Sequence, residues 1–221
     1  MPLRRGNDGE WLTGQSAYTR GLGGDHNLSL DLFMCERVAA DLQRTANTGS
    51  PSIVACMTRL DSLNASSKFA EMYDQLAETE RIRLILEIVT LDANTPTSKI
   101  QEVFGRYRNI TKNLVLHVDV TNTKFREYAA AGVGAVGCYL KHGEADGSPN
   151  SRNVENLNAF GLGARDAGLR CHVHGIDDAE TYAAAIAAGA QFISGGIIGP
   201  LVDSPFAPYP FTTPATASDA A

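Results

Sequence analysis

The chain has 221 residues, of which 43% are hydrophobic and 20% are charged, and this composition is typical of one globular domain with a large core. The formal net charge is −6, with no cluster of basic residues beyond Arg4 and Arg5, so nucleic acid is not an expected partner. Arg4 and Arg5 precede no apolar run of the secretory type, and no stretch is apolar for long enough to span a bilayer; we therefore expect a cytoplasmic protein without membrane contact.

The ends of the chain differ in composition from its middle. Residues 1–27 are rich in glycine and polar residues, and we expect them to be poorly structured apart from a short element at 11–22. Residues 203–221 consist largely of Pro, Ala, Thr and Ser, which predicts a flexible tail. Residues 28–202 are expected to form one barrel-like domain.

Apolar runs and amphipathic stretches alternate within that domain. Helical periodicity covers 28–45, 68–78, 98–108, 124–131, 154–167 and 178–188. Strands are predicted at 53–60, 84–89, 114–120, 135–141, 169–173 and 191–197. Single helices between strands, several ended by glycine, indicate parallel βαβ units. An eightfold barrel needs about eight strands, so the six predicted here indicate an α/β, TIM-barrel-like fold that is incomplete.

Polar residues on the predicted strands define a candidate site. In such a barrel one strand face packs on the helices and the other faces the interior, where functional side chains gather at the carboxyl ends. Strict alternation turns a polar set away from the apolar, helix-facing positions: Glu87, His117, Asp119, Lys141, His172 and His174. Glu87, Asp119, Lys141 and His174 are therefore predicted to converge at one mouth. The alternative is a satisfied polar network that fills the barrel.

Three chemistries suit such a set. A divalent cation would be held by Glu87 and Asp119 together with His117 or His174. A zinc site is disfavoured, because no third ligand lies near His172 and His174 in the sequence.

The other two chemistries use different residues. Lys141 on a strand could form a Schiff base with a carbonyl substrate, although a lysine there more often pairs with a carboxylate such as Glu87. The glycine-rich segment 194–199, which begins with Ser194, could hold a phosphate with its backbone N–H groups.

Four segments carry a family resemblance over residues 28–200. Residues 86–90 read L-E-I-V-T, residues 173–177 read V-H-G-I-D, and residues 193–200 read I-S-G-G-I-I-G-P. The fourth feature is the spacing between Asp119 and Lys141. In order and spacing these segments resemble the L-E-I-T-E, A-E-G-V-E and I-Q-G-Y motifs and the D-D-F-G to L-K-I-D interval of EAL domains. EAL domains are bacterial cyclic di-GMP phosphodiesterases with a modified TIM barrel.

The departures from that pattern fall on its metal-binding residues. No E-A-L triplet is found, and Met57, Thr58 and Arg59 stand where the family has an asparagine strand. The family's acids are replaced by Thr90 and Val120, the first glutamate of A-E-G-V-E by His174, and the glutamine of Q-G-Y by Ser194. Only four positions keep their chemical character: Glu87, Asp119, Lys141 and Asp177.

The resemblance therefore implies the fold of the EAL family without the hydrolytic activity of that family. We expect no metal or other cofactor and no cyclic di-GMP hydrolysis, because a pair of Mg²⁺ or Mn²⁺ ions needs several oxygen ligands. The seven candidate pocket residues are Glu87, His117, Asp119, Lys141, His174, Asp177 and Ser194.

The leading hypothesis is a non-catalytic EAL-like regulatory module in bacterial signalling that contacts a protein partner; residual nucleotide binding is less favoured. Only residues 1–27 precede the first matched helix, so we expect the barrel to be incomplete at its N-terminal side and to self-associate, or bind a partner, at an open edge. The alternative is a TIM-barrel lyase or isomerase that acts on a small phosphorylated carbonyl compound and uses Lys141 as its Schiff-base lysine. In a third interpretation, the domain only mediates dimerisation.

Overall fold

The computed structural model describes residues 3–5, 11–13, 24–46, 52–89, 95–140 and 151–199. Its main feature is a parallel sheet of six strands in the order β3-β4-β5-β6-β7-β8. The strands are β3 (Val54–Arg59), β4 (Leu84–Val89), β5 (Asn113–His117), β6 (Ala135–Tyr139), β7 (Arg170–His174) and β8 (Phe192–Ser194). Each strand pairs with its neighbours in sequence, which confirms the predicted α/β half-barrel.

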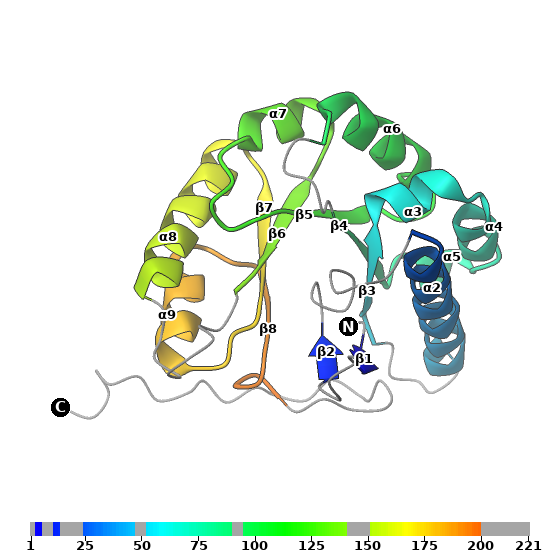
Figure 1. The fold of residues 1–221 in the computed structure, drawn as a ribbon, viewed down its shortest axis with the longest axis horizontal. Coiled ribbons are helices and arrows are strands. Elements are labelled where there is room, and N and C mark those ends of the chain that lie inside the picture. Colours follow the sequence, from blue (N-terminus) through cyan, green and yellow to red (C-terminus); the bar gives the residue numbers. More distant parts are fainter. Residues whose placement is uncertain are drawn as a thin grey trace.

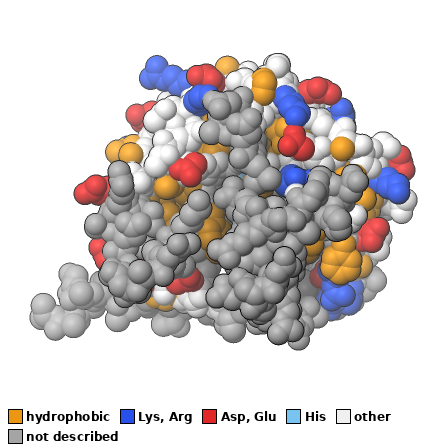
Figure 2. Space-filling view, in the orientation of Figure 1, with side chains coloured by type: hydrophobic (Ala, Val, Ile, Leu, Met, Phe, Trp, Pro, Cys, Tyr) orange, Lys and Arg blue, Asp and Glu red, His pale blue; other side chains and the backbone are white. Residues whose placement is uncertain are grey.

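Helices line the outer side of this curved sheet, and the arc is open on the opposite side in Figure 1. The helices are α2 (Gly24–Ala46), α3 (Leu60–Ala65), α4 (Lys68–Asp74), α5 (Glu78–Arg81), α6 (Thr97–Tyr107), α7 (Phe125–Ala130), α8 (Ser151–Asp166) and α9 (Ala179–Ala187). Acidic and basic side chains are interspersed over the helical rim that Figure 2 shows. None of the helices in the described ranges combines the length and apolarity that a membrane span needs.

Two short strands precede α2. β1 (Leu3–Arg5) and β2 (Trp11–Thr13) pair antiparallel and form a sheet of their own, which in Figure 1 projects into the opening of the arc. Most of the N-terminal 27 residues, and all of 203–221, lie outside the described residues. The expected domain boundaries therefore stay predictions.

Most predicted elements agree with the structure, although β8 ends at Ser194 rather than at residue 197, α3 was not predicted, and one predicted helix is wrong. β4 covers the predicted span 84–89, whereas β5 and β6 end at His117 and Tyr139, before the predicted ends. The single helix predicted at 68–78 is wrong, because α4 ends at Asp74 and α5 begins at Glu78. Arg81 stabilises the break by donating to the carbonyl oxygens of Asp74 and Leu76, at 2.6 and 2.9 Å.

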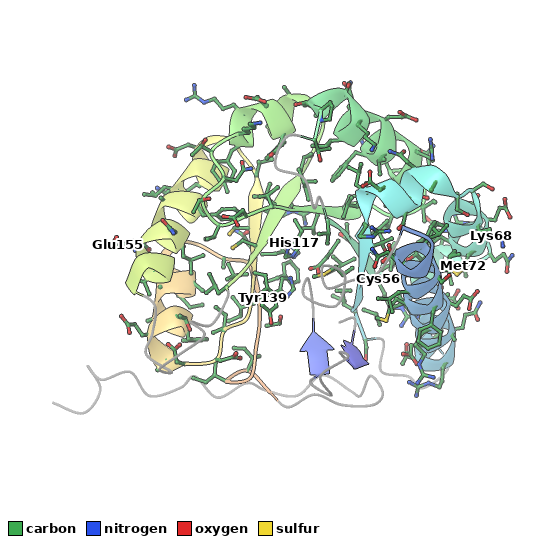
Figure 3. All side chains as sticks on the ribbon, in the orientation of Figure 1. Cys56, Lys68, Met72, His117, Tyr139 and Glu155 are labelled. Atoms are coloured by element: carbon green, nitrogen blue, oxygen red, sulfur yellow. The ribbon has the colours of Figure 1, made fainter. Side chains whose placement is uncertain are left out.

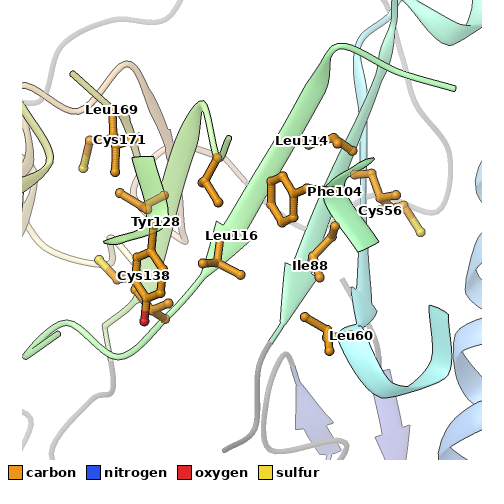
Figure 4. Packing of buried hydrophobic residues seen from close by; sticks show 14 of the residues in the cluster. Cys56, Leu60, Ile88, Phe104, Leu114, Leu116, Tyr128, Cys138, Leu169 and Cys171 are labelled. Carbon is orange, nitrogen blue, oxygen red and sulfur yellow. The ribbon is translucent and has the colours of Figure 1, made fainter. Parts of the chain in front are cut away.

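The core lies between the sheet and its helices. Strand residues such as Leu86, Ile88 and Leu116 are fully buried there. Figure 4 shows Ile88 and Leu116 in this core together with Phe104 of α6. This outer face of the sheet accounts for the apolar positions of the predicted strands. The opposite, inner face begins with a small apolar cluster of Ile85, Val115 and Ala135 and continues with polar residues.

A weakly polar cluster also lies on the outer face, between α2 and β3. The Cys35 Sγ atom is 3.5 Å from the Sγ of Cys56 and 3.3 Å from the Oγ1 of Thr58. All four cysteines are buried free thiols. Burial, followed by the neighbouring Cys56 thiol, raises the pKa of Cys35 well above its ordinary value, whereas the hydrogen bond with Cys35 lowers the pKa of Cys56.

Candidate functional site

Glu87 lies at the centre of the polar inner face. It is the fourth residue of β4, and the alternation that buries Leu86 and Ile88 against the helices turns Glu87 to the other side. Only 3% of the surface of Glu87 is exposed to solvent. A carboxylate buried to this degree needs partners, because transfer of an unpaired charge out of water is unfavourable. Three histidines, one from β5 and two from β7 of the same parallel sheet, supply these partners.

His174 makes the closest contact. As the last residue of β7, it points the same way as Glu87, and its Nε2 atom lies 2.9 Å from the carboxylate Oε1. The other ring nitrogen, Nδ1, lies 2.6 Å from the Oγ atom of Ser194 on β8. The ring is thereby held at both nitrogens, and its orientation is fixed by residues that the parallel register brings together.

His117 and His172 complete the set around Glu87. The Nε2 atom of His117 is 3.8 Å from Oε2, and the Nδ1 atom of His172 is 3.8 Å from Oε1. The His117 and His174 rings lie with their centroids 5.0 Å apart. His117 appears on the inner side of the strands in Figure 3. Both oxygens of one buried carboxylate therefore face histidine nitrogens.

A glycine on β6 leaves the space that the His117 ring fills. Gly137 pairs with His117 in the β5–β6 register and with His172 in the β6–β7 register. A Cβ atom at position 137 would lie 2.7 Å from Nε2 of His117 and 2.8 Å from its Cδ2. Any other residue at position 137 would thus force the buried ring to move.

The cluster keeps a charged carboxylate beside a neutral imidazole. Burial would raise the pKa of Glu87, but the contacts with His172 and His174, followed by the electrostatic interactions with His174 and His117, outweigh it and hold that pKa well below its ordinary value. Burial lowers the pKa of His117 to about 4, against the attraction of the Glu87 charge. At neutral pH the His117 ring is therefore uncharged and Glu87 is ionised.

The structure places the predicted pocket residues in different surroundings. Glu87, His117, His174 and Ser194 lie together, and His172, which sequence analysis left out of the pocket set, joins them. Alternation places His172 on the same strand face as His174, and this pattern is sufficient to predict His172 as a pocket residue. Asp119 and Asp177 are exposed. Asp119 accepts hydrogen bonds from Thr121 in its own loop, and Asp177 accepts one from the backbone N–H of Gly196, which follows β8. Lys141 lies outside the described residues, so its predicted role stays a prediction.

Three of these side chains have the geometry of a cation site. The ligand atoms that Glu87, His117 and His174 offer all lie within 4.8 Å of one another. The set consists of one carboxylate and two imidazoles. Such a mixture suits Zn²⁺ and related transition ions, whereas Mg²⁺ and Ca²⁺ prefer oxygen ligands.

No protein-family model matches the sequence, and no curated protein gives a significant match. Similar folds occur among solved structures. The Bacillus subtilis YkuI protein, which has an EAL domain and is in complex with cyclic di-GMP and calcium, superposes with a TM-score of 0.63 at 16% identity, over 86% of this chain and 46% of that one. This chain therefore spans about half the length of YkuI.

Two isolated EAL domains give similar results. The Xanthomonas citri FimX EAL domain in complex with cyclic di-GMP has a TM-score of 0.63 at 15% identity, over 85% of this chain and 74% of that one. The EAL domain of Mycobacterium smegmatis DcpA has a TM-score of 0.55 at 14% identity, over 81% and 80% of the two chains. Identities this low compare architecture alone. The chain has the fold of an EAL domain, reduced to a half-barrel of six parallel strands in the described residues.

Proposed function

We propose that this chain is a non-catalytic EAL-like module of cyclic di-GMP signalling, which acts through contact with a protein partner. The fold supports the signalling assignment, because two solved structures that share it, YkuI and the FimX EAL domain, are complexes with cyclic di-GMP. The inner-face cluster supports the loss of catalysis.

One observation carries the proposal: both oxygens of Glu87 lie against histidine nitrogens. Hydrolysis of a phosphodiester by a pair of divalent cations requires carboxylate and amide oxygens in fixed positions around both ions. Asp119 and Asp177 are instead exposed and engaged in loop hydrogen bonds. The described inner face thus offers one carboxylate where two hard cations would need several.

The edges of the sheet support the second part of the proposal, contact with a partner. Within the described residues, β3 and β8 each pair with one strand only. An exposed strand edge presents unpaired N–H and C=O groups, which another strand can satisfy. We propose that a partner, or a second copy of this chain, covers one of these edges, and that cyclic di-GMP binding is at most a secondary property.

Calorimetric titration with cyclic di-GMP tests the proposal, with and without Mg²⁺ or Mn²⁺, on the sample that is also assayed for hydrolysis. We expect no turnover under any of these conditions. Turnover that requires Mg²⁺ or Mn²⁺ would overturn the non-catalytic assignment. Tight binding without turnover would make the module a nucleotide receptor, and Glu87→Gln would then show whether the inner face holds the nucleotide.

Solution scattering tests the open edge separately. We expect the mass to rise with protein concentration as edges pair between copies. A monomer at every concentration, with the scattering profile of a closed barrel, would contradict this part of the proposal. The hydrolysis assay and the scattering measurement can fail independently, because one concerns the inner face and the other the sheet edges.

A further inference from the structure

The inner-face cluster also has a composition that non-catalytic signalling does not require. A buried carboxylate can be satisfied by two or three hydrogen bonds from any donors. Among the described residues, the side chains that form ion pairs with it are imidazoles: His117 of β5, and His172 and His174 of β7. Imidazole nitrogens and carboxylate oxygens are typical ligands of zinc and related ions.

We propose that Glu87, His117 and His174 bind one divalent transition-metal ion of the zinc class. This inference goes beyond the proposed function, which neither needs nor excludes such an ion. The three ligand atoms already lie within 4.8 Å of one another on three adjacent or nearly adjacent strands. No chain rearrangement is needed to bring them together.

The separations fit an ion after a small adjustment. Ligands at zinc distances of about 2.0–2.2 Å in tetrahedral array lie roughly 3.4 Å from one another. The distance from His117 Nε2 to Glu87 Oε2 is 3.8 Å, close to that value. The distance from His174 Nε2 to the other carboxylate oxygen, Oε1, is 2.9 Å, so for a carboxylate that binds through both oxygens the ring would move outward by about half an ångström to admit the ion. His174 is the most exposed of the three residues, and its movement is the easiest.

Ser194 provides the supporting contact that metal-binding histidines have. Such a histidine binds the ion with one ring nitrogen and donates the N–H of the other to an oxygen, which fixes the ring. In His174, Nε2 faces the proposed ion position and Nδ1 lies 2.6 Å from the Ser194 hydroxyl. A hydroxyl can both donate and accept, so this contact persists when Nε2 exchanges its proton for a metal.

Hard cations do not fit the same residues. Ca²⁺, which accompanies cyclic di-GMP in YkuI, takes six to eight oxygen ligands, and Mg²⁺ takes an octahedral oxygen set. One carboxylate and two imidazoles provide neither. The inference is therefore that the inner face selects a different class of metal from the one found with this fold in YkuI.

Zn²⁺ titration of the full chain, freed of tags and of metal by chelation, tests the inference by calorimetry. We expect one Zn²⁺ to bind per chain. Co²⁺ bound in its place should give the visible absorption bands of an ion with a low coordination number. Mg²⁺ at the same concentration should not compete. Failure of Zn²⁺ to bind, or equal competition by Mg²⁺, would overturn the inference.

Single variants locate the ion. His174→Ala and His117→Ala should each weaken Zn²⁺ binding by more than about 100-fold, because each removes a ligand. Ser194→Ala, at an exposed position, should weaken it by about 10- to 100-fold without affecting folding. Thermal melting of each variant without metal separates lost binding from lost folding. Unchanged affinity in the folded Ser194→Ala and His174→Ala proteins would overturn the assignment.

The matched control replaces the same residue type elsewhere in the chain. The double variant His26→Asn and His142→Asn removes the two histidines that lie outside each of the strands β3 to β8 in the sequence. It should bind Zn²⁺ as the unaltered chain does, and loss of binding here would contradict the proposed ligands. Hydrolysis of cyclic di-GMP by the Zn²⁺-loaded chain would leave the metal site intact and overturn only the non-catalytic function, so the two proposals fail separately.

Discussion

The two faces of the six-stranded sheet bury polar groups in different ways. On the outer face, Cys35, Cys56 and Thr58 contact one another between α2 and β3. On the inner face, Glu87 is buried as an ion among histidines. Burial acts on both clusters in the same direction and disfavours charge. The two clusters differ in composition, because the outer one consists of thiols and a hydroxyl, whereas the inner one contains a carboxylate whose charge the imidazoles compensate.

This difference separates stability from function in the fold. The outer face holds the large apolar side chains whose burial drives folding, at about 25 cal/mol per Å² of apolar area. The inner face, beyond Ile85, Val115 and Ala135, holds polar groups whose arrangement depends on strand register. We therefore expect outer-face substitutions to change stability most, and inner-face substitutions to change pH dependence and metal affinity.

The largest expected effect is on the outer face. Leu86→Ala should lower the free energy of unfolding by about 2–5 kcal/mol, because Leu86 is fully buried and its truncation leaves a cavity. Urea denaturation measures the change. Leu162→Ala, at a leucine that is 49% exposed on α8, is the matched control and should cost less than about 0.5 kcal/mol. Similar losses in both variants would contradict the division between core and surface.

Acid should destabilise the metal-free protein through the inner face. The pKa of His117 is lowered to about 4 in the folded chain, whereas an unfolded histidine titrates near 6.5. Between these values the unfolded chain binds a proton that the folded chain does not, so stability falls as the pH falls, by roughly 3 kcal/mol at most. The low pKa of Glu87 has the same sign, and its stabilisation is lost as the pH falls below about 4.5.

His117→Asn separates these two contributions. Urea denaturation of the chelator-treated variant from pH 7 to pH 4 should show a smaller loss of stability than the unaltered chain, because the group that titrates in the unfolded state is gone. The loss below about pH 4.5 should remain, since Glu87 is still present. An unchanged profile between pH 6.5 and pH 4 would mean that the burial of His117 does not carry the acid sensitivity.

A smaller effect is expected where the inner face requires empty space. Gly137→Ala should lower the free energy of unfolding by about 1–3 kcal/mol, because its Cβ atom would lie 2.7 Å from the buried His117 ring. It should also weaken Zn²⁺ binding by displacing that ring. Gly134→Ala is the matched control just before the same strand, where a Cβ atom meets no heavy atom within 4 Å. Its stability should stay the same or rise by about 0.4–1 kcal/mol.

The elements of the outer face were predictable because local pattern determines them. The run at 84–89 alternates buried leucine and isoleucine with Glu87 and agrees with β4, and the helix predicted at 98–108 is α6, displaced by one residue. The break between α4 and α5 was not predictable, since it depends on hydrogen bonds that Arg81 makes to Asp74 and Leu76 across the turn. Periodicity carries no information about such a contact.

The inner-face site was predictable only in part. Alternation placed Glu87, His117 and His174 on the interior side of their strands. The direct contact between Glu87 and His174 depends on the register of strands that lie 87 residues apart in sequence, and no local pattern gives that register. Asp119 follows the end of β5 rather than lying within it, and it takes part in a turn with Thr121. Asp119 would point into the cluster only if β5 continued beyond His117, and it does not.

The smallest stability effect is expected for Ser194→Ala, which combines an inner-face contact with an exposed position. Its hydroxyl lies 2.6 Å from Nδ1 of His174, but water can replace a hydrogen bond at an exposed site, so the free energy of unfolding should change by less than about 0.5 kcal/mol. Ser67→Ala removes a comparable exposed contact, 2.7 Å to Glu71, and should also leave stability unchanged. The two variants should differ in Zn²⁺ affinity, which falls only in Ser194→Ala because only that serine orients a ligand. Equal affinities would mean that the inner face is, like the outer one, a structural arrangement, and the contrast between the two faces would reduce to the charge of Glu87.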